Sequence, residues 1–231
     1  MKRSELAHIL RSACRITGDP DILVIGSQSI LGKFSHAALP DEAWLSVEAD
    51  IAFFDDPEES KADEIDGKIG EASPFHDSFG VYGQGVSLTT ATLANGWRDR
   101  LVPFTHGDVG ESRAMCLDPH DLVVSKLVAN REKDIEFAGA VIAARLVDVE
   151  RLIELVDELP TPEAVRRRVR ATITKIASIT PKLAATQQKP GAGNLAPARR
   201  TDRVPKGTPH GGRFRARRGD PDDAGLQGED G

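Results

Sequence analysis

Two carboxylates stand two residues apart in the segment SVEADI. Residues i and i+2 of a strand point to the same face, with Cα atoms roughly 6.5–7 Å apart. Glu48 and Asp50 therefore share one face, and Val47, Ala49 and Ile51 form an apolar face that we expect to be buried. Paired carboxylates suit Mg²⁺, a hard cation that keeps several waters and is usually completed by substrate phosphates. The alternative is the solvent-facing side of an amphipathic strand.

An apolar run ends abruptly before the carboxylate strand begins. Residues 22–25 are Ile-Leu-Val-Ile, and Gly26 and Ser27 follow at once. This pattern indicates a buried strand that turns sharply, and backbone N–H groups freed at such a turn bind phosphate. A phosphate-binding turn and a dicarboxylate strand form a coherent pair, since one holds a triphosphate and the other holds its metal. A tight turn without a ligand is the alternative.

A third set of polar residues lies in the segment LDPHDLVVSKLVANREKDIEF. Lys126 has apolar neighbours, and Asp134 follows eight residues later. On one continuous helix the two would lie about 12 Å apart along the axis, so they could only flank a shared ligand. A break near Asn130 would bring them closer. The alternative is a lysine with a buried stem and an ordinary charge set of Arg131, Lys133 and Asp134.

The order of apolar strand, Gly-Ser, helix and acidic strand resembles the nucleotidyltransferase superfamily of the polymerase-beta type. The stretch from about 5 to 155 is also similar to a family of uncharacterised bacterial proteins that is grouped with nucleotidyltransferases. The segment with Lys126 and Asp134 resembles the Lys…Asp block of AbiEii-type toxin nucleotidyltransferases, in which an Arg-x-Lys-Asp element follows a helical lysine. The last helix and the tail lie outside the resemblance.

This resemblance implies a Mg²⁺-dependent enzyme that moves an NMP from an NTP to an acceptor, either an RNA, tRNA included, or a protein. It implies that Gly26 and Ser27 bind the β- and γ-phosphates of the nucleotide. It also implies that Glu48 and Asp50 are catalytic carboxylates that bind the divalent metal.

For Lys126 and Asp134 the resemblance implies catalytic roles as well. Lys126 would neutralise a nucleotide phosphate, and Asp134 would act near the sugar or the metal. AbiEii-type enzymes are the toxins of toxin–antitoxin pairs, which implies an antitoxin protein as a partner.

Two other hypotheses stay open. One is a catalytically inactive module of the same fold that binds a nucleotide, an RNA or a protein. The other is an unrelated α+β protein in which Glu48 and Asp50 do not converge with Ser27.

The elements that position these residues predict an α+β fold with a small mixed or antiparallel nucleotidyltransferase-like sheet and flanking helices. We expect helices over 3–16 and 59–69, a short helix from Ser29, and strands over 21–25 and 46–54. Three later runs, separated by Gly, Asn and Asp, read as a meander: 85–94, 99–105 and 112–119. The segment 82–85 favours a hairpin turn, and a substrate-facing loop is the alternative.

The chain becomes helical after residue 117. Asp118 is the expected N-cap of the first helix, with Pro119 at its first position, and Thr161 is the expected N-cap of the last. From residue 184 the composition is rich in Gly, Pro, Arg and Asp, so we expect disorder. The predicted parts are a core over 1–116, helices packed on it over 117–183, and a tail over 184–231.

Composition and charge narrow the function classes. The net charge is −6, but residues 187–231 hold nine Lys or Arg against six Asp or Glu, so the rest is more acidic still. An acidic body argues against a sequence-independent nucleic-acid binder but allows an enzyme that acts on an RNA end. Two distant cysteines without metal-ligand spacing argue against zinc and favour a reducing cytoplasm. We see no signal peptide and no membrane span.

Weaker candidates are two histidines, a Trp-Arg segment and an arginine-rich helix. His76 and His120 lack a nucleophile partner. Trp97, with Arg98 and Arg100 nearby, would either stack on a base or simply pack. The run AVRRRVR and the arginines of the tail would either contact RNA phosphates or remain solvated.

Overall fold

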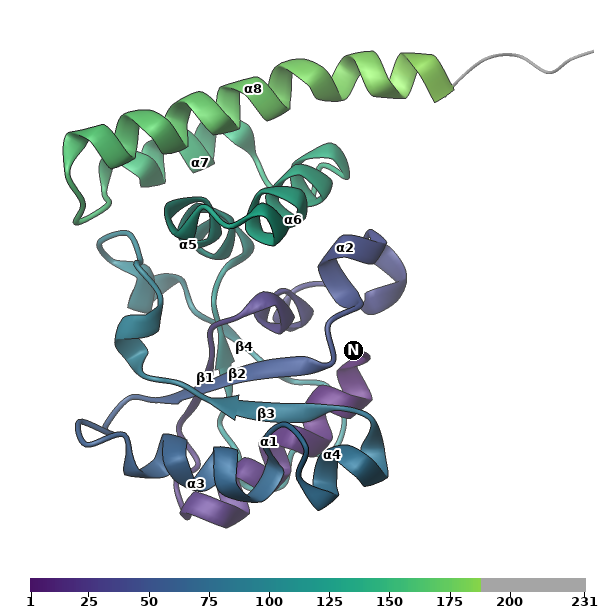
Figure 1. Ribbon diagram of the computed structural model, residues 1–231, viewed down its shortest axis with the longest axis vertical. Coiled ribbons are helices and arrows are strands. Elements are labelled where there is room, and N and C mark those ends of the chain that lie inside the picture. The colour runs from purple at the N-terminus through teal and green to yellow at the C-terminus, as the bar shows by residue number, and fades with distance from the viewer. Residues whose placement is uncertain (188–231) are drawn as a thin grey trace, which may run out of the picture. The chain divides into compact units, whose positions relative to one another are not determined.

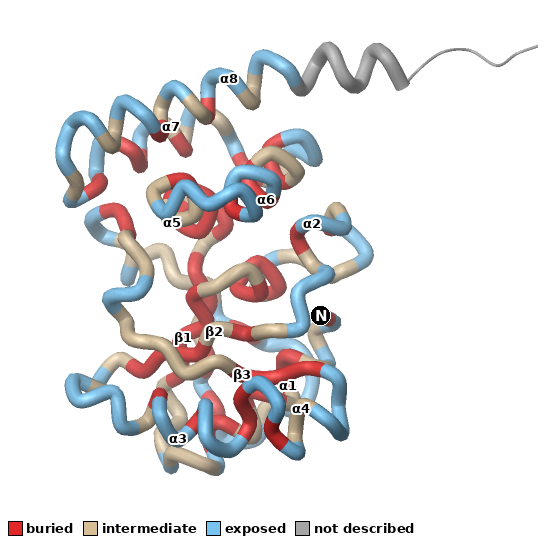
Figure 2. Tube along the Cα trace, in the orientation of Figure 1, coloured by how far each residue is buried: buried red, intermediate tan, exposed pale blue. Residues whose placement is uncertain are grey.

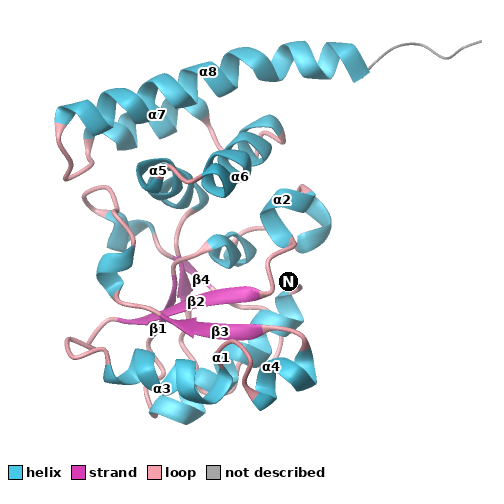
Figure 3. Cartoon of the chain, in the orientation of Figure 1, coloured by secondary structure: helices cyan, strands magenta, loops and turns pink. Residues whose placement is uncertain are grey.

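A mixed sheet holds the strand that carries the two carboxylates. The computed structural model describes residues 1–187 of the 231-residue chain. Within that range the strands form one five-stranded sheet in the order β3-β2-β1-β5-β4. Figure 3 shows strands between two groups of helices. β1 pairs antiparallel with β2 and parallel with β5, while β3 joins β2 in parallel and β4 joins β5 antiparallel. The strands are β1 (Ile22–Val24), β2 (Glu48–Phe53), β3 (Tyr82–Gly85), β4 (Val102–Pro103) and β5 (Met115–Cys116).

Helices cover both faces of this sheet (Figure 1). α1, α3 and α4 lie on one side and α5 to α8 on the other, with the 3-10 helix η1 in contact with both β2 and α5. None of the helices in the described part of the chain has the length and apolarity needed to cross a membrane. Their bounds are α1 (Arg3–Thr17), η1 (Ser27–Gly32), η2 (His36–Ala38), α2 (Asp41–Trp44), α3 (Ser60–Ile69), α4 (Pro74–Phe79), η3 (Leu88–Thr90), η4 (Trp97–Arg100), α5 (Pro119–Ala129), α6 (Glu132–Ala143), α7 (Val149–Asp157) and α8 (Glu163–Gln187).

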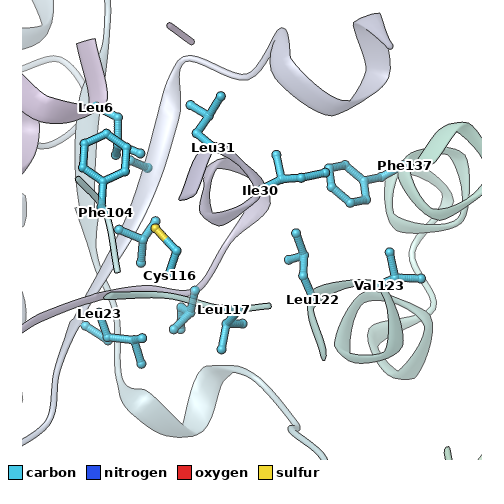
Figure 4. Packing of buried hydrophobic residues seen from close by; sticks show 14 of the residues in the cluster. Leu6, Leu23, Ile30, Leu31, Phe104, Cys116, Leu117, Leu122, Val123 and Phe137 are labelled. Atoms are coloured by element: carbon cyan, nitrogen blue, oxygen red, sulfur yellow. The ribbon is translucent and has the colours of Figure 1, made fainter. Parts of the chain in front are cut away.

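One hydrophobic cluster runs from α1 through the sheet into the helices on the other side (Figure 2). Leu6, Ile9 and Leu10 of α1 are fully buried in this cluster. On the opposite side, Ile30 of η1 points toward Phe137 of α6, and both side chains are buried (Figure 4). The turn after β1 is therefore fixed by the apolar residues of η1, which lie between sheet and helices.

The predicted meander is wrong in its first strand. The run 85–94 holds the last residue of β3, η3 and irregular backbone, whereas the other two runs contain β4 and β5, which pair. The segment Tyr82–Gly85, which was expected to be a hairpin turn, is instead β3. It is the edge strand of the sheet and lies next to β2. A Cβ on Gly85 would lie 2.0 Å from the carbonyl oxygen of Ala62 on α3. Because α3 packs on bare backbone there, this strand lacks the apolar alternation that would have revealed it.

Helix starts follow the sequence signals at one site and depart from them at another. The side chain of Asp118 accepts the N–H of His120 at the start of α5, as predicted. The prediction of Thr161 as the cap of α8 is wrong, because its hydroxyl is buried without a hydrogen-bond partner. The helix begins at Glu163, and the carbonyl oxygen of Pro162 accepts the N–H groups of Val165 and Arg166.

The last helix passes the predicted end of the helical part. α8 continues to Gln187, beyond residue 183. The predicted disordered tail, 184–231, lies outside the described residues apart from this end of α8. The arginines of the tail that were considered for RNA contact lie outside them too.

Candidate active site

The Gly-Ser turn follows β1 directly and lies beside Asp50. The N–H of Ile25 donates to the carbonyl oxygen of Asp50 over 3.1 Å, which extends the pairing of β1 with β2. The carbonyl of Gly26 accepts the N–H of Ser29 over 2.9 Å, and η1 starts at Ser27. The buried strand therefore turns sharply at Gly-Ser, as the sequence predicted.

Gly26 is required by space rather than by its backbone conformation. Its φ is −82°, a value open to every residue. A Cβ on Gly26 would lie 1.4 Å from Oδ2 of Asp50 and 2.4 Å from its Cγ. The carboxylate of Asp50 therefore lies against the bare backbone of residue 26.

β2 carries Glu48 and Asp50 on one face, as its alternation predicted. Ala49 and Ile51 are fully buried on the other face. Val47 was expected to be buried with them, but it is 44% exposed, because it precedes the first paired residue of β2. The strand is thus anchored by its apolar face while both carboxylates remain partly exposed.

The carboxylate of Glu48 affects the ionisation of Asp50. Burial and the neighbouring charge of Glu48 raise the pKa of Asp50 to about 6, against the opposing effect of Lys126 and Lys133. The hydroxyl of Tyr82 donates to Oε2 of Glu48 over 2.9 Å. Burial and this hydrogen bond raise the pKa of Tyr82 to about 12, so Tyr82 remains a donor at neutral pH. A cation between the carboxylates would relieve their repulsion.

A cavity of about 420 Å³ lies at this face of β2. Ser27, Glu48 and Asp50 line the same cavity, contrary to the hypothesis of an unrelated fold, which predicted that they do not converge. The full lining comes from the Gly-Ser turn, β2, the segment after η3, α5 and the start of α6: Ile25, Gly26, Ser27, Ser46, Glu48, Asp50, Thr90, Ala91, Thr92, Leu122, Ser125, Lys126, Val128, Ala129, Arg131 and Lys133.

A helix break brings Lys126 and Asp134 together. α5 ends at Ala129, and Asn130 adopts a positive φ of 59°, so the chain reverses before α6. The break that was considered near this residue is confirmed. Nζ of Lys126 lies 3.0 Å from Oδ1 of Asp134, and Nε of Arg131 lies 2.6 Å from its Oδ2.

Asp134 supports the cavity wall from behind. Its side chain is fully buried, and it is not one of the lining residues, whereas Lys126 and Arg131 are. Burial opposes its ionisation, but hydrogen bonds from Arg131 and Lys126 lower the pKa of Asp134 below its ordinary value. Nζ of Lys126 also lies 4.8 Å from the ring centroid of Phe137. Asp134 therefore holds two cationic side chains, those of Lys126 and Arg131, at the cavity.

Several residues of this cavity were not expected from the sequence. The segment 90–92 had been assigned to a strand, and Ser125 had not been considered. Its position carried a signal, because Leu122, Ser125, Lys126 and Ala129 follow the three- and four-residue steps of one helix face. Tyr82 does not line the cavity, but it bonds to Glu48 and was also missed. It gave no signal in the sequence, since its contact with the carboxylate strand depends on the pairing of β3 with β2.

The two histidine candidates have structural partners outside the cavity. Nδ1 of His120 lies 2.6 Å from Oδ1 of Asp118, and its Nε2 accepts the N–H of Asp148 over 3.0 Å, which links α5 to α7. Nδ1 of His76 accepts the N–H of Ala72 over 3.1 Å. Neither histidine lines the cavity.

The Trp-Arg segment packs rather than lining the cavity. Trp97 is half-buried, and the guanidinium of Arg98 lies 4.9 Å from its ring centroid. Arg100 forms a two-point pair with Asp121 at 2.7 and 2.8 Å, and the Asp121 side chain is almost fully buried. This pair holds η4 against α5.

Arginines of the run AVRRRVR also bond within the molecule. Arg166 pairs with an acid of its own helix, and Arg170 pairs with Asp157. Arg168 donates to the carbonyl oxygen of Val128 over 2.8 Å. Because Val128 lines the cavity, α8 is bonded directly to the cavity wall.

Comparison with known proteins identifies the family. A family model described as a nucleotidyltransferase of unknown function (DUF6036) matches residues 4–180. The match includes most of α8, which was expected to lie outside the resemblance. Neither the curated proteins nor the solved structures gave a match. Since the family model covers well over half of the chain, the chain belongs to this nucleotidyltransferase family.

Proposed function

We propose that the cavity binds an NTP with Mg²⁺ and transfers the NMP to a hydroxyl of an RNA, tRNA included, or of a protein. The observation that carries this proposal is the shared lining of one cavity by the Gly26-Ser27 turn and the Glu48–Asp50 pair. The charge of the lining adds support, because the cationic side chains of Lys126, Arg131 and Lys133 would neutralise the phosphates.

The donor set fits Mg²⁺. Glu48 and Asp50 supply carboxylate oxygens from one rigid strand, and no group of three or more His, Cys, Asp or Glu suited to a metal occurs among residues 1–187. Two carboxylates with the remaining positions left to water and phosphate oxygens is the usual arrangement for this ion. When bound, Mg²⁺ would offset phosphate charge and orient the in-line displacement.

In the proposed reaction the acceptor oxygen forms a bond to the α-phosphorus, and the bond to the β-phosphate bridging oxygen breaks. Pyrophosphate leaves, and the acceptor proton passes to a carboxylate of the Glu48–Asp50 pair or to water. Ser27 and the turn orient the β- and γ-phosphates, and Lys126 neutralises them. Asp134 acts as a positioning residue, since it holds Lys126 and does not line the cavity.

The test is incubation of the protein with each α-³²P-labelled NTP, Mg²⁺ and total tRNA. Label that enters RNA or protein with the unmutated chain and not with Asp50→Ala is the expected result. Asp77→Ala is a matched control, because Asp77 is an exposed carboxylate on α4, on the other side of the sheet. Equal labelling by Asp50→Ala and the unmutated chain would refute the assigned chemistry.

An inactive binding module is the second candidate. It is favoured by one observation: Glu48 and Asp50 are the only acidic residues among the described lining residues. Nucleotide binding without label transfer to any acceptor would select this candidate.

We further propose that the physiological role is that of a toxin with a protein antitoxin, on the likeness of the Lys126 to Asp134 block to AbiEii-type enzymes. Induced expression of the chain in bacteria should arrest growth, and Asp50→Ala should not. Growth arrest by both chains, or by neither, would contradict this role.

A further inference from the structure

Part of the cavity wall is uncharged, and the proposed phosphate and metal chemistry does not use it. It consists of Thr90, Ala91 and Thr92 at and after the end of η3, and of Leu122, Ser125, Val128 and Ala129 of α5. We infer that this neutral wall receives the nucleobase and that Thr92 and Ser125 select among the four NTPs. The inference rests on the proposed function, because it assigns the remaining part of the same cavity.

The segment 90–92 lies toward the opposite end of β2 from Ser46. β3 runs parallel to β2, and the N–H of Val86 donates to the carbonyl oxygen of Ile51 over 2.9 Å, so the chain leaves β3 toward the carboxyl end of β2. Ser46 precedes the amino end of β2 and also lines the cavity. The cavity therefore extends along β2, and Asp50 lies between its two ends.

Two of the cavity cations, Arg131 and Lys133, belong to a different part of the wall from the segment 90–92. Arg131 and Lys133 come from the start of α6, and α6 packs on α2, the helix just before Ser46. The segment 90–92 is instead followed by residues that bond to α5 and α7. Lys126 comes from α5, but its Nζ lies 3.0 Å from Oδ1 of Asp134 in the first turn of α6, so its charge is held at the α6 side. The three cations suit the phosphates, and the uncharged residues remain for the base.

The neutral wall is held in place by its own hydrogen bonds. Arg100 donates to the carbonyl oxygen of Asn95 over 3.1 Å while it pairs with Asp121 of α5. The N–H of Asn95 donates to the carbonyl oxygen of Glu158 over 2.9 Å, beyond the end of α7. The segment that leads out of 90–92 is thus anchored to two helices before a ligand arrives.

Hydroxyl groups suit the recognition of a base. Serine and threonine hydroxyls both donate and accept, so they match the mixed edge of a nucleobase. Thr92 and Ser125 are half-buried at the cavity, where water competes less for these bonds. Apolar contacts from Leu122 and Ala91 would cover the base faces. A site that hydrogen-bonds its substrate rejects a base that leaves those groups unpaired.

The experiment measures kcat/KM for ATP, GTP, CTP and UTP with the full chain, Thr92→Val and Ser125→Ala. We expect each variant to lower the ratio of the preferred nucleotide to the others by roughly tenfold, the loss of about one hydrogen bond. Lys133→Met is the matched control, because loss of an exposed cavity cation should weaken all four NTPs to a similar extent. Thermal unfolding of each variant at the temperature of the unmutated chain would show that the fold is retained.

Failure of the inference is distinguishable from failure of the proposed function. If the unmutated chain is active and the two variants change kcat/KM for all four nucleotides equally, or for none of them, the inference alone is overturned. If the unmutated chain transfers nothing, calorimetric affinities for the four Mg²⁺–NTP complexes replace kcat/KM and the same ratios decide. A chain that binds none of the four nucleotides would overturn both.

Discussion

The carboxylate of Asp50 occupies the space that any side chain at position 26 would need. Its Oδ2 lies 1.4 Å from the place where a Cβ on Gly26 would stand. The backbone of the Gly26-Ser27 turn and the side chain of Asp50 on β2 are therefore in direct contact, and the absence of a side chain at residue 26 leaves room for the acid.

Gly26→Ala should lower the proposed transfer rate by about a hundredfold, because displacement of a reacting group by about an ångström costs on that order. The new methyl group must push the Asp50 side chain into another rotamer. Initial rates of label transfer would measure the loss. The double variant Gly26→Ala/Asp50→Ala should be no slower than Asp50→Ala alone; a further loss would show that Gly26 acts by another route.

Tyr82→Phe should raise the Mg²⁺ concentration needed for half-maximal transfer by roughly tenfold, since partners that orient a metal-binding carboxylate contribute on that scale. The substitution removes only the hydroxyl that donates to Oε2 of Glu48. Rates across a Mg²⁺ titration, after removal of metal with a chelator, would measure the shift. An unchanged Mg²⁺ dependence would mean that Tyr82 only packs.

Asp134→Asn should raise the KM for the NTP about tenfold with a smaller effect on kcat, because Lys126 and Arg131 lose the carboxylate that positions them. The variant should also unfold with a free energy lower by about 1–3 kcal/mol, the usual cost of disturbed buried hydrogen bonds. Steady-state kinetics and urea unfolding would measure the two effects. A loss of kcat as large as that of Asp50→Ala, with KM unchanged, would instead indicate direct catalysis by Asp134.

Asp118 should make stability depend on acid pH. Burial opposes its ionisation, but hydrogen bonds from the side chain and N–H of His120 and the charge of Lys33 lower its pKa from 3.8 to about 2. A lowered carboxylate pKa stabilises the fold fully above its ordinary value, and the stabilisation disappears as the pH falls through about 2. The contribution is about 2 kcal/mol at neutral pH.

Asp118→Asn isolates this effect, since asparagine still caps a helix but carries no charge. Urea unfolding of both chains at several pH values should show a difference at pH 7 that shrinks between about pH 4 and 2. A constant difference over that range would exclude the linkage.

The parts of the site that could be predicted from sequence are those set by local pattern. Alternation along SVEADI placed Glu48 and Asp50 on one face, and the change from apolar residues to Gly-Ser placed the turn. Asp118 indicated a helix start, because Asp is a preferred N-cap residue and proline is favoured at the first helical position. Each of these features depends on residues a few positions apart.

The parts that were missed depend on tertiary packing. β3 has two glycines because α3 lies against it, so no apolar alternation marks it as a strand. Tyr82 reaches Glu48 only through the parallel pairing of two strands that are far apart in sequence. The break at Asn130 was open from the sequence, since asparagine tolerates a positive φ but does not require it.

The hydrogen bond from Arg168 to the carbonyl oxygen of Val128 connects α8, the last helix, directly to a residue that lines the cavity. Val128 lies two residues after Lys126 on α5, so the hydrogen bond joins α8 to the part of α5 that lines the cavity. Removal of α8 would leave that carbonyl oxygen without this donor. A ligand or protein that binds α8 would therefore contact an element that is hydrogen-bonded to the cavity wall.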